Sequence, residues 1–140
     1  MWKYAIAALA ASCLASNLAL ADATPISKEA KAYIVWPKNG MVIHGGKLWV
    51  RMGIKNAGVT PAGIEKVNAG HHHLIVDAPL PPLDQEIPAD KNHLHFGAGQ
   101  TEVRLELPPG EHTLQLLFAD FEHVPHNPPV FSEKVTIIVP

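Results

Sequence analysis

The chain has 140 residues, with 11 lysines and arginines against 13 aspartates and glutamates, and it contains nine histidines. A net charge of −2 gives no electrostatic basis for binding nucleic acid or an anionic membrane surface. Cys13 is the only cysteine, which leaves the rest of the chain without a disulfide, a thiolate metal ligand or a cysteine nucleophile.

Residues 1–21 are predicted to form a secretory signal peptide. Lys3 precedes an apolar run at 5–14, and small residues at 19–21 form an A-x-A type cleavage site. We expect cleavage after Ala21 and a periplasmic or secreted protein with no membrane insertion afterwards. A transmembrane anchor is less favoured, because polar residues interrupt the apolar span. Lipid attachment at Cys13 is also less favoured, because the residues before it lack the usual leucine.

The remainder is predicted to form a polar lead at 22–31 and a single domain at 32–140. Seven short β-rich runs, separated by prolines and glycines, follow at 33–36, 41–44, 47–54, 71–77, 101–107, 112–120 and 133–139. Apolar and polar residues alternate in several of them, and no stretch after the leader keeps a helical period. The pattern predicts an all-β fold, an antiparallel, immunoglobulin-like β-sandwich of about seven strands. The loop at 78–100 is long for a sandwich, which is typical of a functional loop.

Three consecutive histidines, His71, His72 and His73, lie in one of the predicted strands. Side chains alternate across a strand, so His71 and His73 share one face and His72 the other. His72 is expected to face the core with Leu74 and Val76. The other two rings then project together, and an H-x-H pair on a strand is a recurrent way of holding zinc or copper.

Further histidines are expected to meet this pair, because the loops of a sandwich gather at its ends. A second H-x-H lies in the long loop, and DFEHVPHNPP adds two more imidazoles. The candidate metal ligands are His71, His73, His93, His95, His123 and His126. The candidate second-shell or alternative ligands are His72, Asp77, Gln100, Glu102, His112 and Asp120. Imidazole and carboxylate without thiolate suit Cu(II), Zn(II) or Ni(II), and the order of affinities favours copper; we expect Cu(II) or Zn(II).

Some of these residues also have a structural interpretation. A single histidine is usually a surface residue or a hydrogen-bonded partner, which we expect for His44 and, through neighbouring backbone, for His112. His72, if it faces inward, must find a buried acceptor, so we expect it to be a hydrogen-bonded core residue. The glycines of GAGQ at 97–100 allow either a close approach that lets Gln100 or Glu102 orient an imidazole, or a turn that starts the next strand.

Three long segments, GHHHLIVD, HLHFGAGQTEVRLELPPGEHTLQLLFAD and HVPHNPPVFSEKVTIIV, resemble a family of exported bacterial proteins known only as a domain of unknown function. The resemblance covers about residues 65–140 and implies export but no activity. Residues 33–54 are similar to the opening strands of bacterial immunoglobulin-like domains. The signature positions are His71, His72, His73, Asp77, His95, Gly97, Gly99, Gln100, Thr101, Glu102, His112, Asp120, His123 and His126.

Four functions compete on this evidence. The favoured one is an exported module that binds a divalent metal, and the alternative is a structural or protein-interaction module with hydrogen-bonded histidines. An enzyme using Glu102 or Asp120 as a base ranks lowest, because the chain lacks nucleophile, phosphate-loop and dinucleotide motifs. Charging of the histidines near pH 6 would also permit acid-dependent partner binding.

Overall fold

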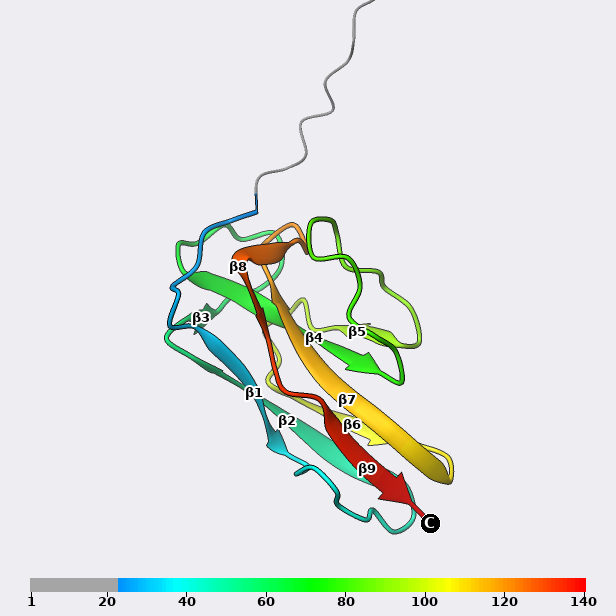
Figure 1. Cartoon of the computed structure of the whole chain (residues 1–140). Coiled ribbons are helices and arrows are strands. Elements are labelled where there is room, and N and C mark those ends of the chain that lie inside the picture. Colours follow the sequence, from blue (N-terminus) through cyan, green and yellow to red (C-terminus); the bar gives the residue numbers. More distant parts are fainter. Residues whose placement is uncertain (1–22) are drawn as a thin grey trace, which may run out of the picture.

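Nine β-strands form two sheets that pack face to face in the computed structural model, which describes residues 23–140 (Figure 1). The predicted signal peptide and its cleavage site lie outside the described residues. The strands are β1 (Lys31–Trp36), β2 (Lys47–Lys55), β3 (Gly58–Val59), β4 (Ala69–Val76), β5 (His93–His95), β6 (Glu102–Glu106), β7 (Gly110–Ala119), β8 (Pro125–Phe131) and β9 (Val135–Val139).

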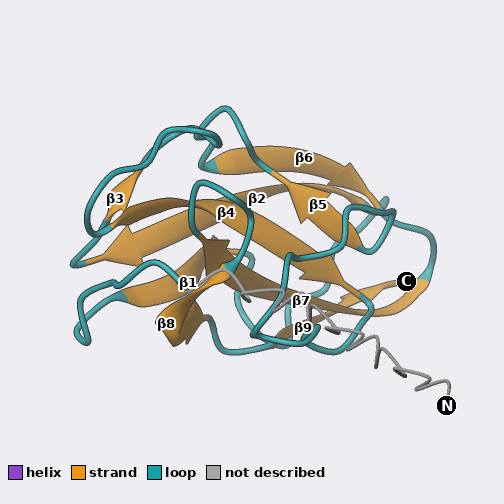
Figure 2. Cartoon of the chain, turned by 90° about the horizontal axis from the view of Figure 1, so that it is seen from above, coloured by secondary structure: helices purple, strands orange, loops and turns teal. Residues whose placement is uncertain are grey.

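One sheet has three strands in the order β1-β2-β6, and the other has six. In the larger sheet β4 and β7 pair antiparallel at the centre; β3 and β5 line the far edge of β4, and β8 and β9 follow one another along β7. The described residues contain strands and loops and no helix (Figure 2), so none of them forms a helix able to cross a membrane. The predicted all-β sandwich is confirmed, with a parallel β3–β4 pair added to otherwise antiparallel pairing.

The main core lies between the sheets and follows the alternation seen in the sequence. Leu48, Val50 and Met52 point inward from β2, while every second residue of β7 from Leu114 to Phe118 meets them from the other sheet. Burial of apolar surface of this kind contributes roughly 25 cal/mol per Å². The expected half-buried strand is therefore confirmed for β2, whereas β7 is buried on both faces from Leu114 to Ala119.

The larger sheet is covered on its second face as well. Ile75 of β4 packs with Leu117 and Ala119 of β7 and with Ile87 of the long loop, and further apolar side chains of that loop pack against them. Every residue of β4 is consequently buried. The loop runs beside β4 and β5 (Figure 1), so the outward-facing histidines of β4 lie beneath cover rather than on a free surface.

Some elements differ from the predicted ones. The run at 41–44 makes only an isolated bridge between Val42 and Ile138. Strands β5 and β8 were expected to be loops. β8 contains three prolines, which are tolerated because it pairs only with β7 at the edge of the sheet. The lead is also packed, since Pro25 bridges to Asn127 and Ile26 is buried in the core.

Candidate metal centre

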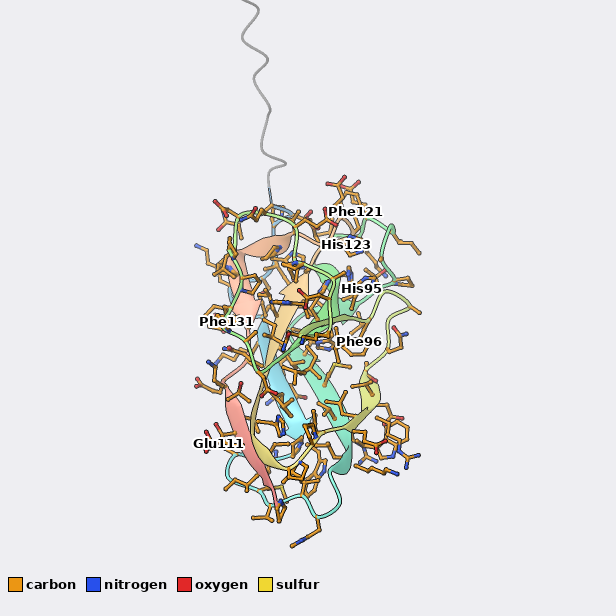
Figure 3. The ribbon with its side chains drawn as sticks, turned by 90° about the vertical axis from the view of Figure 1, so that its right-hand side faces the viewer. His95, Phe96, Glu111, Phe121, His123 and Phe131 are labelled. Atoms are coloured by element: carbon orange, nitrogen blue, oxygen red, sulfur yellow. The ribbon has the colours of Figure 1, made fainter. Side chains whose placement is uncertain are left out.

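Four imidazoles from three parts of the chain meet on the outer face of the larger sheet. His71 and His73 come from β4, His95 from β5, and His123 from the turn before β8. The centroids of their rings lie 4.6–6.1 Å apart in every pairing. We call these four residues the histidine cluster. Figure 3 shows the side chains of His95 and His123 lying close together at one end of the domain.

Strand register explains how the first three rings meet. β5 pairs antiparallel with β4 so that His95 lies directly opposite His73. Residues in such cross-strand pairs have Cβ atoms roughly 5 Å apart. His71 lies two residues earlier on the same face of β4. Both histidines of the first H-x-H pair, His71 and His73, thus belong to the cluster. Of the second pair, only His95 does.

A tight turn after β7 brings the fourth ring, that of His123, to the cluster. β7 ends at Ala119, opposite His71, and Asp120 then folds the chain back. The Asp120 carboxylate accepts hydrogen bonds from the backbone N–H groups of Glu122 and Val124, at 2.9 and 3.0 Å. His123 adopts a positive φ of 66° within this turn. Because few non-glycine residues adopt that region, the local network of Asp120 determines where the His123 imidazole lies.

The two rings on β4 are buried without hydrogen-bond partners. His71 is 0% exposed and His73 is 1% exposed. Neither ring nitrogen of His71 has a partner in the described structure, and neither does Nδ1 of His73. Leaving such an atom unsatisfied costs about 1–3 kcal/mol, so most buried polar groups in proteins are paired. An ion bound between the rings would satisfy them.

Burial lowers the pKa of three rings of the cluster. Desolvation by burial, followed by repulsion from His95 and His123, lowers the pKa of His71 from 6.5 to about 4. Desolvation, with the other rings adding to it, lowers the pKa of His73 to about 2. The pKa of His95 is also lowered, mainly by desolvation and then by His123. Neutral imidazole, which keeps one N–H and offers the lone pair of its other nitrogen, is the form that ligates metals, so the lowered pKa values leave His71, His73 and His95 in the ligating form at neutral pH.

The donor set fits a tripodal metal site. His71, His95 and His123 each offer a ring nitrogen, and these nitrogens all lie within 4.8 Å of one another. Two nitrogens bound to one tetrahedral zinc at about 2.1 Å lie roughly 3.4 Å apart. Small rotations of the partly exposed rings of His95 and His123 would close that difference. Three histidines with an open fourth position match the pattern of zinc sites that retain a water or exchangeable ligand.

Two neighbours of the cluster support this arrangement. A Cβ atom on Gly97 would lie 2.3 Å from Cε1 of His95, so the His95 ring occupies space that only glycine leaves free. The expected close approach at the GAGQ glycines is therefore present, although its partner is His95. Glu86, in the long loop, places a carboxylate oxygen 4.0 Å from Nδ1 of His123. No motif marks Glu86 in the sequence.

Two predicted ligands lie apart from the cluster. Nδ1 of His93 pairs with the Asp90 carboxylate at 2.8 Å, which also lowers the pKa of Asp90 by hydrogen bonding. His126 lies at the start of β8 on the core side of the sheet, where its Nδ1 bonds the carbonyl of Thr24 at 2.9 Å and its ring stacks on Phe118. Both predictions need correction, because β5 and β8 turn these rings toward other partners.

His72 faces the core as expected, but it lacks the expected hydrogen bond. It is 0% exposed, neither ring nitrogen has a partner in the described structure, and its ring meets Phe118 edge-on at 5.1 Å. Desolvation lowers its pKa to about 4. The prediction of a satisfied core histidine is thus wrong for the described residues, because Leu74, Val76 and the side chains packed with them offer no acceptor.

Asp77 and His112 form a separate pair. β4 ends at Val76, and Asp77 adopts a positive φ of 54°, which removes it from the face of His71 and His73. Its carboxylate bonds Nδ1 of His112 at 2.7 Å, while Nε2 of His112 lies 2.7 Å from the carbonyl of Pro108. The hydrogen bond to Asp77 is the main cause of a raised His112 pKa. The structural role expected for His112 is confirmed. Asp77, predicted as a second-shell or alternative metal ligand, is instead the hydrogen-bond partner of His112.

None of the remaining polar candidates is hydrogen-bonded to an imidazole within residues 23–140. Gln100 accepts a hydrogen bond from the backbone N–H of Ala98 within a turn, and Glu102 pairs with Arg51 on β6 and β2. Asp120 bonds backbone groups and the Thr24 hydroxyl rather than any imidazole within residues 23–140. The geometry corrects the second-shell role expected of Gln100 and Glu102, and Asp120 acts by shaping the turn of His123.

Comparison with known proteins gives a family and a distant structural likeness. No curated protein matches the chain. The fibronectin(III)-like modules of CbhA from Clostridium thermocellum are similar in structure, with a TM-score of 0.41 and 14% identity over 77% of this chain and 94% of that chain. The family described as "Domain of unknown function (DUF4399)" matches residues 50–140, which agrees with the resemblance drawn from the histidine-rich segments. Because this match spans more than half of the sequence, the chain belongs to that family.

Proposed function

We propose that this domain binds one divalent transition-metal ion, Cu(II) or Zn(II), through His71, His95 and His123. The observation that carries the proposal is the buried His71 ring, whose two nitrogens have no partner within residues 23–140 while two further imidazoles surround it. Imidazole donors without thiolate suit both ions, and the order of affinities favours copper.

His73 completes the environment of the ion. Its ring lies 4.8 Å from that of His71 and 5.1 Å from that of His95, and it is fully buried. It is available as a fourth nitrogen donor or as a neighbour of a ligand in the fourth position. On the opposite side, His95 is exposed and His123 partly exposed, so the ion would be reached from solvent through these two rings.

An accessible ion of this kind suits exchange more than permanent structural support. Structural zinc sites are closed and fully ligated by protein, whereas exchange requires an open position. Together with the predicted signal peptide, this supports a periplasmic carrier or buffer of metal. Neither base proposed for an enzyme is free at the cluster, since Glu102 lies on another sheet and Asp120 is engaged with backbone.

The test uses untagged protein prepared without a nickel column. Calorimetric titration with Cu(II) and with Zn(II) is expected to show one bound ion per chain. His95→Ala is expected to weaken binding at least about 100-fold, because it removes a ligand. His93→Ala is the matched control from the same H-x-H pair and is expected to leave affinity unchanged. Circular dichroism of the metal-free variants checks that each is folded.

Two results would contradict the proposal. One is the absence of stoichiometric binding of either ion by the folded wild-type protein. The other is an equal loss of affinity in His93→Ala and His95→Ala, which would mean that the metal is held by the exposed edge of β5 rather than by the cluster.

A further inference from the structure

The outer face of the three-stranded sheet carries exposed aromatic and basic side chains. Trp36 is 40% exposed and Trp49 is 49% exposed. Strand register places Trp36 opposite Arg51 and Trp49 opposite Arg104. We call this surface the basic aromatic face; it comprises the outward-facing residues Lys31, Tyr33, Trp36, Lys47, Trp49, Arg51, Lys55, Glu102, Arg104 and Glu106.

Charge on this face differs in sign from that of the whole chain. Its outward positions on β1, β2 and β6 carry five basic and two acidic side chains, namely Lys31, Lys47, Arg51, Lys55, Arg104, Glu102 and Glu106. The chain as a whole has a net charge of −2. A local excess of positive charge on an acidic protein attracts a negatively charged partner and suppresses neutral or basic ones.

Two ion pairs offset two of the five positive charges on this face and leave a net excess of three. Lys47 and Glu106 are 3.8 Å apart, and Arg51 and Glu102 are 3.5 Å apart. All four side chains are more than half exposed. Exposed pairs contribute little and are readily exchanged. An incoming carboxylate would therefore compete with Glu102 for Arg51 at small cost.

A groove of about 470 Å³ gives the face a specific shape. Trp36 and Trp49 line it together with Val42 and Leu48, and Lys47 and Arg51 lie along it. The groove thus brings two indoles and two cationic groups around one recess of mixed polarity. Tryptophan, tyrosine and arginine are also the residues most enriched at the energetic centres of protein interfaces.

We infer that the basic aromatic face is the docking site for an acidic polypeptide segment, with an apolar side chain of the partner seated between Trp36 and Trp49 and carboxylates on Lys47 and Arg51. The observations are independent of the metal proposal, because this face belongs to the other sheet. Loss of metal binding would leave this site in place.

The probe is a fluorescent ten-residue peptide of glutamates with one central leucine. Wild-type protein is expected to bind it, with affinity that falls as ionic strength rises. Replacing the glutamates by lysines, or the leucine by glycine, is expected to weaken binding at least about tenfold. Anisotropy of the peptide and quenching of tryptophan fluorescence report the two partners separately.

Substitutions in the protein locate the site. Trp49→Ala and Arg51→Gln are each expected to weaken binding about tenfold or more, because the groove loses its apolar wall or its cation. Lys66→Gln is the matched control, since it removes one positive charge from an exposed loop away from this face. Circular dichroism confirms that the variants are folded.

Each other outcome overturns the inference. Equal binding by the glycine-containing peptide, or an equal effect of Lys66→Gln, would indicate attraction by net charge without a groove. Binding of polygalacturonate or of phosphatidylglycerol vesicles in preference to the peptide would assign the face to a different class of ligand. Self-association abolished by Trp49→Ala would assign it to a second copy of this chain.

Discussion

The two faces of strand β4 present the same residue type in opposite surroundings. His71 and His73 face outward, where His95 and His123 surround them, while His72 faces the core alone against Phe118. All three rings of β4 are buried, and all three have lowered pKa values because burial disfavours the charged form. Burial alone therefore does not distinguish a candidate ligand.

The two faces of β4 differ in whether ring nitrogens from other parts of the chain meet those of β4. On the outer face, nitrogens from three elements lie close enough for one ion to satisfy them. On the inner face, His72 and His126 each contact Phe118, and neither belongs to a group of three possible ligands within residues 23–140. The proposed metal ion would give the outer rings a partner, whereas His72 contributes only the cost of its desolvation.

The largest effect in this comparison is expected from His72→Leu. In the folded protein His72 has a pKa of about 4, against 6.5 when unfolded. Because its pKa is depressed by folding, the unfolded state binds the proton first, and stability is lost as the pH falls from 6.5 toward 4. At pH 5 this loss amounts to about 2 kcal/mol. His72→Leu removes that contribution.

Urea unfolding of metal-free protein at pH 7 and pH 5 measures the loss of unfolding free energy that is due to His72. The drop in unfolding free energy between the two pH values is expected to be about 2 kcal/mol smaller in His72→Leu than in wild type. His44→Leu, at an exposed position, is the control and should leave the drop unchanged. An unchanged drop in His72→Leu would mean that the inner ring is solvated or hydrogen-bonded after all.

A smaller effect is expected from Gly97→Ala on the outer face. The added Cβ would lie 2.3 Å from Cε1 of His95, so the ring must move away from the cluster. We expect metal affinity to fall about tenfold, as when groups that orient a ligand are lost. Gly58→Ala is the matched control, since its Cβ would meet only the Ala69 side chain at an ordinary 3.7 Å.

Titration calorimetry of both glycine variants gives the answer. If Gly97→Ala binds metal as tightly as Gly58→Ala does, the position of His95 is irrelevant to the ion and the outer face has no advantage over other exposed histidines.

The two-residue alternation of the sequence is sufficient to predict the inward faces of β2 and β7 and the side of β4 on which each histidine ring lies. The alternation from Leu48 to Met52 and from Leu114 to Phe118 predicts their inward faces, and H-x-H predicts that His71 and His73 share a side. These properties depend only on the two-residue period of a strand.

Which of the other histidines join the cluster depends on contacts between residues that are distant in the sequence. The pairing of β5 with β4 decides that His95 meets His73, and the Asp90 carboxylate holds His93 elsewhere. The backbone bonds of Asp120 direct His123, while His126 enters a proline-containing strand that the pattern does not reveal. No local rule gives these registers, so six ligands were predicted where four rings meet.

The most direct test of the central claim is a nitrogen-15 NMR titration of the histidine side chains with Zn(II), which is diamagnetic. The account predicts that the ring nitrogens of His71, His95 and His123 shift strongly with one equivalent, while those of His72 keep their chemical shifts. Unchanged nitrogens in His71, or larger shifts in His93 and His126 than in the cluster, would contradict it.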